Sequence, residues 1–278
     1  MKDCSFLYQP EDRIICEEVL SSSLWEDAGK TPVNELAIMA GKYFLSVPYR
    51  ANTIEREGAE ALVVNLRQFD CFTFLENVIV LARLIEAGKT TFWDYRAQLA
   101  KIRYRQGRLR GYASRLHYFS DWMDDNQKKG ILKDITSEIG GKPCQKEINF
   151  MTKHCEKYPP LKDEKTCREM LALEKYLSLQ PRHIIPKDDV APIEDMITDG
   201  SIIGITTTVE GLDVSHVGFA LRKNSRLHLL HASLEEKKVV ISKDTLHEYL
   251  RRKESMSGIV VGWIQPMKAM ASVKMKTI

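Results

Sequence analysis

The sequence of 278 residues contains no run of 18 or more apolar residues, so we expect no transmembrane helix. It also lacks the GxSxG, HExxH, P-loop and Rossmann glycine motifs, which argues against serine hydrolases, zinc proteases, ATPases and dehydrogenases. A net charge of only +3 gives no global reason to expect a polyanion-binding protein. With 44% apolar and 28% charged residues, the composition is typical of a folded globular chain.

Cysteine is scarce, and its six copies show no CxxC spacing. This argues against a disulfide scaffold, a zinc ribbon or a redox pair. Cys144, Cys155 and Cys167 crowd one region, with His154 beside them. Because their spacing fits no familiar zinc pattern, we expect reduced thiols or one disulfide there, and neither a metal nor a cofactor is required.

The first twenty residues lack the unbroken apolar stretch of a secretory signal, because Asp3, Glu11, Asp12 and Arg13 interrupt them. We therefore expect either a cytoplasmic protein or a chain from which a leader was removed. A chain of this length should bury about three-quarters of its unfolded surface, so one domain over residues 1–278 needs no covalent staple.

The N-terminal part has helical patterns. Proline residues at first helical positions predict helices over 10–20 and 33–44. After Asp70, residues 71–85 are apolar on nearly every side, which is typical of a buried helix. Gly88 is expected to end this helix.

After Gly200 the pattern changes to that of strands. Short β-branched runs separated by turn residues predict antiparallel strands over 201–207, 214–221, 227–231, 239–242 and 259–264. The intervening segment 89–195 is polar and rich in turns, with a helical pattern over 163–180. Helices first and strands last indicate an α+β fold in which the helices pack on an antiparallel sheet.

Cys71 is the strongest candidate for chemistry. Asp70 is a favoured N-cap residue and would place Cys71 in the first turn of the buried helix. The positive end of a helix dipole stabilises the thiolate, which is the reactive form of cysteine, and lowers its pKa. Free cysteines are also common as small core residues, so the alternative is that Cys71 only fills space.

A thiol nucleophile needs a base within hydrogen-bond reach. On a strand, His216 shares a face with Gly218 and Ala220, so it would look onto a crowded, partly open site. His231, one strand later, could orient His216, whereas His228 falls on the opposite strand face from His231. Each histidine could equally be a satisfied surface residue.

The order of these residues resembles the NlpC-type papain-like peptidases of bacterial cell walls. The family's PY, DC, HVG and HA motifs match Pro48-Tyr49, Asp70-Cys71, His216-Val217-Gly218 and His231-Ala232. The resemblance implies a papain-like fold with Cys71 as nucleophile, His216 as base and His231 as the orienting residue. It also implies that Tyr49 and Asp70 contact the substrate.

Residues 65–77 and 111–122 are similar to a narrower branch, the N-acetylmuramoyl-L-alanine amidase-like proteins. Phe72-Thr73 stands where the core family often has Ser-Gly, which points to this branch. The branch implies cleavage between N-acetylmuramic acid and L-alanine in peptidoglycan fragments, in the cell envelope or periplasm. Alternatives are an L-alanyl-γ-D-glutamyl endopeptidase of the same fold and a non-catalytic muropeptide-binding module. Segment 89–195 would be a branch-specific insertion that contributes to the substrate site.

Segment 101–117 has six cations and no acid, interleaved with aromatic residues. Arginine forks suit the carboxylates of a muropeptide stem. Around this segment we expect substrate contacts from Arg108, Tyr112, Arg115, His117, Tyr118 and Trp122. The alternatives are a solvated basic loop and a surface for single-stranded nucleic acid, although no recognised nucleic-acid motif accompanies it.

Overall fold

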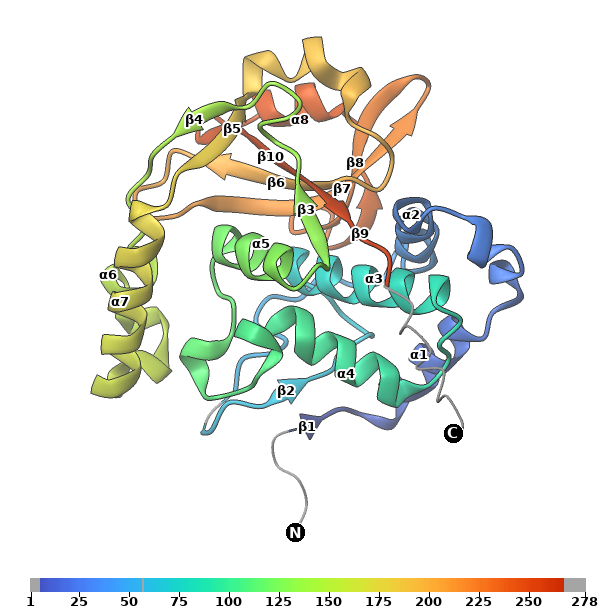
Figure 1. Ribbon diagram of the computed structural model, residues 1–278, viewed down its shortest axis with the longest axis horizontal. Helices are drawn as coiled ribbons and strands as arrows, with labels where there is room; N and C mark the ends of the chain where they lie inside the picture. The colour runs from blue at the N-terminus through green and yellow to red at the C-terminus, as the bar shows by residue number, and fades with distance from the viewer. Residues whose placement is uncertain (1–5, 57, 268–278) are drawn as a thin grey trace, which may run out of the picture.

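The computed structural model describes residues 6–56 and 58–267, which form a helical layer against one face of an antiparallel sheet (Figure 1). The sheet has eight strands in the order β4-β5-β10-β6-β7-β8-β9, and β3 also pairs with β10. Its strands are β3 (Leu132–Asp134), β4 (Lys142–Cys144), β5 (Arg182–Pro186), β6 (Ile202–Thr207), β7 (Val214–Lys223), β8 (Arg226–Ser233), β9 (Lys238–Ile241) and β10 (Met256–Ile264). A separate parallel pair joins β1 (Phe6–Leu7) to β2 (Leu62–Val63).

The helices are α1 (Pro10–Leu20), α2 (Val33–Tyr43), α3 (Cys71–Glu86), α4 (Phe92–Arg103), α5 (Phe119–Lys128), α6 (Phe150–Lys153), α7 (Glu164–Leu179) and α8 (Leu246–Arg251). The helices predicted over 10–20, 33–44, 71–85 and 163–180 are confirmed as α1, α2, α3 and α7. The five predicted strands are confirmed as β6 to β10, so the expected mixture of helices with an antiparallel sheet is present.

Segment 89–195 is more ordered than its polar composition predicted. It contains α4 and α5, and its strands β3, β4 and β5 extend the sheet beyond β10. These three strands are only three to five residues long, which is too short for a clear period-2 pattern. The segment that was expected to be an insertion therefore also supplies strands to the sheet.

Helix α3 is buried along its length, as the apolar residues on all its sides predicted. It contacts α2, α4, β7 and β8. Gly88, with a φ of +63°, ends it in the left-handed conformation that glycine adopts readily.

Strand β7 is buried on both faces. Val217, Phe219 and Leu221 belong to the core that contains α3, whereas Ala220 belongs to a second core with Leu250 of α8. This confirms the predicted division of the strand's side chains between two faces. Helix α8 was not predicted, and it covers the face to which Ala220 points.

Cys144, Cys155 and Cys167 are unpaired, so of the two states expected for them the structure shows the reduced one. Within residues 6–56 and 58–267, no three histidine, cysteine or acidic side chains gather as a metal site would require. In the same ranges no helix is both long and apolar enough to cross a bilayer.

Candidate active site

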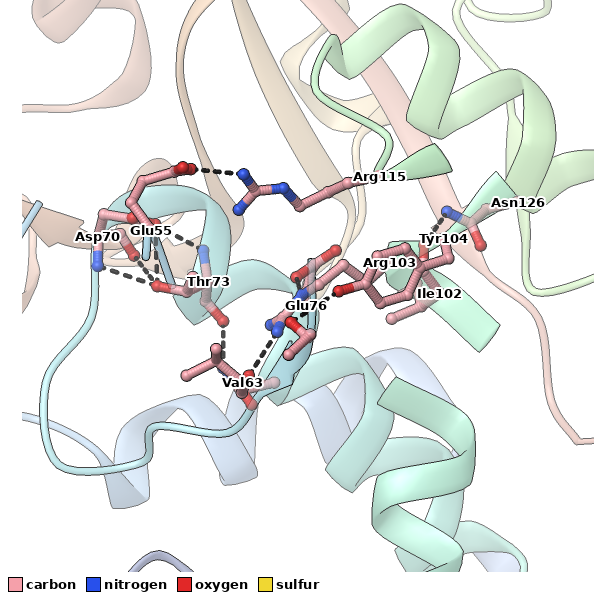
Figure 2. A network of polar contacts seen from close by, with 12 residues as sticks. Glu55, Val63, Asp70, Thr73, Glu76, Ile102, Arg103, Tyr104, Arg115 and Asn126 are labelled. Atoms are coloured by element: carbon pink, nitrogen blue, oxygen red, sulfur yellow. Dashed lines mark hydrogen bonds and ion pairs between the residues drawn. The ribbon is translucent and has the colours of Figure 1, made fainter. Parts of the chain in front are cut away.

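The first turn of α3 is held by a reciprocal cap between Asp70 and Thr73 (Figure 2). The Thr73 N–H donates to Asp70 Oδ1 at 2.7 Å, and the Asp70 N–H donates to Thr73 Oγ1 at 3.0 Å. This arrangement confirms the predicted N-cap. The N–H groups of Cys71 and Phe72 have no carbonyl partner in the first turn, and both lie within hydrogen-bond reach of the Cys71 sulfur.

The Cys71 side chain is half-buried against the edge of β7. The N–H of Val217 reaches its sulfur, which places Cys71 next to the residue that follows His216. The regular pairing between β7 and β8 begins at Phe219, so Val217 lies outside that ladder. The structure thus brings the predicted nucleophile to the strand that carries the predicted base.

Burial, and then the nearby Asp70 carboxylate, raise the pKa of the Cys71 thiol, which is about 12. The N–H groups of Val217, Cys71 and Phe72 act in the opposite direction, because they stabilise the thiolate. The lowering expected from the helix N-terminus is therefore present but outweighed by desolvation. The resting thiol is neutral at pH 7.

His216 and His231 form a direct pair. Their Nε2 and Nδ1 atoms lie 2.6 Å apart, and the rings meet edge to face at 88°. Gly218 makes this contact possible, since a Cβ at that position would lie 2.9 Å from the Cβ of His231. The expected grouping of His216 with Gly218 on one strand face agrees with this packing.

Both histidines are neutral at pH 7. Burial lowers the pKa of His216 to about 4, and the positive charge of Lys253 adds to this effect. Burial lowers the pKa of His231 to about 2, with further lowering by His216 and Arg252. When His216 donates its Nε2 proton to His231, its Nδ1 is left as an unprotonated base.

Two tyrosines border this group. Burial raises the pKa of Tyr49 to about 12, and the nearby Cys71 and Asp70 add to the shift, so Tyr49 lies beside the nucleophile as expected. Tyr249 of α8 packs edge-on against His231, with ring centroids 5.5 Å apart, and lies 6.3 Å from the His216 ring. Sequence reasoning missed Tyr249 because α8 was not predicted and no motif marks this residue.

Much of the positive charge of segment 101–117 is neutralised inside the protein. Arg103 is buried and donates to Glu76 at 2.7 Å, and its guanidinium also binds the carbonyl of Val63 (Figure 2). Arg105 forms a bidentate pair with Asp121, at 2.6 and 2.8 Å. The acids that pair with these arginines lie outside segment 101–117. For this reason the sequence of the segment alone showed an excess of positive charge.

Arg115 and His117 are turned inward. Arg115 pairs with Glu55 at 2.7 Å and with Glu60 at 3.5 Å, and its guanidinium stacks over the Tyr112 ring at 4.9 Å. His117 Nε2 lies 2.9 Å from the Tyr112 carbonyl oxygen. Burial, and then the charge of Arg115, hold the pKa of His117 well below its usual value.

A cavity of about 140 Å³ adjoins the first turn of α3. Asp70, Phe72 and Thr73 form one wall, and Arg115 and His117 form another. The cavity borders the helix turn that carries Cys71, although Cys71 itself is not one of its lining residues. Arg115 and His117 therefore lie near this turn.

Tyr118 and Trp122 do not reach the surface of this cavity. The Tyr118 hydroxyl donates to Glu174 at 2.6 Å inside the protein. Trp122 is 0% exposed and packs edge-on against Phe72, with centroids 5.5 Å apart. Because buried rings have no surface for a ligand, we remove these two predicted contacts from the site. Arg108 is exposed, and its predicted role remains a prediction.

A second cavity, of about 510 Å³, lies between α5, α7 and the strands β5 and β6. Lys146, Arg182 and Asp213 contribute polar groups to it, and Val214 of β7 forms part of its wall. Val214 precedes Val217 by three residues, or about 10 Å along an extended strand. The cavity is therefore close to the candidate active site and separate from it.

The chain is similar to known proteins of one family. A family model described as N-acetylmuramoyl-L-alanine amidase-like (AmiA-like) matches residues 39–259. A crystal structure of an N-acetylmuramoyl-L-alanine amidase from Bacteroides uniformis is 36% identical, with a TM-score of 0.79, and the match covers 84% of this chain and 99% of that one.

A structure from Bacteroides fragilis that is called a xylanase is 37% identical, with a TM-score of 0.77, over 81% of this chain and 100% of that one. A Legionella pneumophila protein, 21% identical with a TM-score of 0.68 over 92% and 95% of the two chains, shows the same fold. No curated protein matches significantly.

Proposed function

The chain belongs to the N-acetylmuramoyl-L-alanine amidase-like family, and from this membership we propose that it is a cysteine amidohydrolase of peptidoglycan fragments. The proposed reaction cleaves the amide between N-acetylmuramic acid and L-alanine. The observation that carries the proposal is that Val217 lies close enough to Cys71 for its N–H to lower the thiol pKa, and that the preceding residue, His216, is itself paired with His231. A cell-envelope location remains part of this proposal.

In the proposed mechanism, His216 Nδ1 takes the proton of the Cys71 thiol as the sulfur attacks the amide carbonyl carbon. The N–H groups of Cys71 and Phe72 are the nearest donors for the developing oxyanion. His216 then gives its proton to the L-alanine nitrogen, the C–N bond breaks, and a thioester to Cys71 remains. Water, deprotonated by His216, hydrolyses the thioester and restores the thiol.

His231 has a positioning role in this mechanism. Its Nδ1 accepts the Nε2 proton of His216 at 2.6 Å, which selects the tautomer with a free Nδ1. Because the pKa of His231 is lowered to about 2, it stays neutral and keeps this acceptor role over the whole working pH range. Tyr49 is proposed to line the site beside Cys71.

A cysteine at a helix N-terminus, set against a histidine on an antiparallel sheet, also supports a papain-like, NlpC-type placement. Segment 89–195 supplies Arg115 and His117 to the cavity beside Cys71, and Lys146 and Arg182 to the larger one. We propose on this basis that the segment contributes to the substrate site. It also contributes strands to the sheet, so we describe residues 1–278 as one domain.

The proposal is tested with a disaccharide-tripeptide substrate and mass analysis of the products. Release of the free tripeptide supports the amidase, whereas L-alanine left on the sugar indicates the endopeptidase alternative. Cys71→Ala should abolish hydrolysis, and Cys155→Ala, at an exposed free thiol, is the matched control. If the wild type binds the substrate but never hydrolyses it, the non-catalytic binding module is the correct reading.

The name of the Bacteroides fragilis structure suggests xylan as a second substrate to test. Glycosidases usually place two free carboxyl groups about 5 to 9.5 Å apart across the scissile bond. Near Cys71, however, Asp70 is engaged in the helix cap and Glu76 in a buried ion pair with Arg103. We therefore expect no release of reducing sugar from xylan.

A further inference from the structure

Arg115 is a buried cation on the wall of the 140 Å³ cavity. Its side chain is 5% exposed, and Asp70, Phe72 and His117 line the same space. Because removing a charge from water is costly, a buried guanidinium is retained only with partners of opposite charge. The partners of Arg115 therefore indicate what the cavity binds.

The two carboxylates that pair with Arg115 differ in how firmly they are held. Glu60 is 7% exposed, lies 3.5 Å from Arg115 Nε, and also accepts the Tyr104 hydroxyl at 2.9 Å. Glu55 is 40% exposed and pairs with Arg115 Nη2 at 2.7 Å (Figure 2). Glu60 is thus part of the interior, whereas Glu55 reaches Arg115 from the solvent side.

Glu55 lies in a turn-rich stretch between Asn52 and β2, outside any helix or strand. A partly exposed ion pair of this kind contributes little stability, so its acid can be replaced without unfolding the chain. Arg115 Nε is buried and faces Glu60 at 3.5 Å, without a hydrogen bond within the described residues. The guanidinium therefore has one fixed partner, Glu60, and one exchangeable partner, Glu55 on Nη2.

We propose that Arg115 is a receptor for a substrate carboxylate, and that Glu55 occupies this receptor in the free protein. The inference rests on the proposed function and names a group recognised at the same site. L-alanine is joined to the amino group of D-glutamate, and the γ-carboxyl of D-glutamate forms the bond to the third stem residue. This leaves the α-carboxylate of D-glutamate free, one residue beyond L-alanine. On binding, this carboxylate replaces that of Glu55, which turns into solvent.

The chemistry favours a carboxylate over its neutral analogue. An arginine fork binds the two oxygens of a carboxylate with charge-assisted hydrogen bonds, and a carboxamide offers one acceptor oxygen and no charge. Glu55 competes with the ligand for Arg115. A ligand that cannot displace the Glu55 carboxylate leaves the ion pair between Glu55 and Arg115 intact. Because this ion pair must break before the ligand binds, the apparent affinity for the ligand is lower than its intrinsic affinity.

The first test compares kinetics on two substrates, the disaccharide-tripeptide and its D-glutamate α-carboxamide, in both of which the γ-carboxyl is bound to the third residue. Glu55→Gln should lower KM for the carboxylate about fivefold, the limit expected for a partly exposed ion pair. The same variant should leave KM for the carboxamide unchanged. Glu169→Gln, which removes an exposed pair with Lys165 on α7, is the matched control. An equal effect of Glu55→Gln on both substrates, or none on either, would overturn the proposal.

The second test measures binding without turnover, by calorimetry with the free stem tripeptide and its D-glutamate α-carboxamide as probes. We expect the wild type to prefer the carboxylate at least tenfold, Glu55→Gln to bind it more tightly, and Arg115→Lys to lose the preference. Should Arg115→Lys not fold, the wild type and Glu55→Gln decide the result on their own.

These two tests separate this inference from the proposed function. Carboxylate-selective binding without any hydrolysis would refute the amidase and leave the receptor standing. Hydrolysis with equal affinity for the two probes would leave the amidase standing and refute the receptor.

Discussion

Two regions were predicted from the sequence to be functional: the contact between α3 and β7, and the basic segment 101–117. In the structure their side chains have different kinds of partners. At α3 and β7, Cys71 lies near Val217, the residue that follows His216, and His216 is paired with His231. In the segment, Arg103 and Arg105 face acids from other elements. A proposed nucleophile and base can be predicted together, because the reaction requires both. The partner of a cation cannot be predicted in this way, because any acid that the fold places nearby can pair with it.

The largest effect should come from removing the proposed base. His216→Ala should lower kcat by about 10²- to 10⁴-fold, because a positioned general base contributes this much. His228→Gln is the control, since His228 lies on the next strand and hydrogen-bonds the Ser242 carbonyl away from the pair. Steady-state kinetics on the disaccharide-tripeptide measure kcat for both variants. A similar decrease of kcat in both would count against His216 as the general base.

The contrast within the basic segment predicts a large effect on stability. Arg103→Met leaves Glu76 as an uncompensated buried charge and should cost about 3–5 kcal/mol of unfolding free energy. Arg108→Met, at an exposed position of the same segment, should change it by less than about 0.5 kcal/mol. Urea denaturation of both variants measures the difference. Equal stabilities would show that the segment is a solvated loop after all.

A smaller effect is expected at the positioning residue. His231→Gln should lower kcat by about 10- to 100-fold, in the range found for residues that orient a ligand histidine. KM should change little, because His231 does not face the substrate in the proposed mechanism. An altered acid limb of the pH–rate profile should accompany the loss, since the hydrogen bond to His231 selects the His216 tautomer that acts as the base. A variant with a normal profile would assign His231 a purely structural role.

The smallest expected effect is a pH dependence of stability. The pKa of His216 is lowered to about 4 and that of His231 to about 2, so the unfolded chain binds protons near pH 6.5 while the folded chain stays neutral. Stability from these groups is therefore complete above pH 6.5 and falls as the pH drops toward 4. The melting temperature of His231→Gln should fall less steeply over this range than that of the wild type. Parallel curves would contradict the burial argument.

Local sequence patterns were reliable where one element decides the outcome. The Asp70 cap and the all-round apolar pattern after it predicted α3 and the position of Cys71 on it. The alternation in β7 predicted that His216 and Gly218 share a face. Sequence patterns did not predict features that depend on residues far apart in the chain. Examples are the short strands β3 to β5, which pair within the sheet, and Trp122, which is buried in the core.

The sequence by itself determined the buried helix with a thiol in its first turn and the histidines on strands, because capping and periodicity act within a few residues. Only the tertiary structure decided which side chains share a space. It set Arg115 between Glu55 and Glu60, placed Tyr249 against the histidine pair, and kept the Cys71 thiol neutral. Electrostatics and desolvation depend on neighbours far apart in the chain, and these exist only once it has folded.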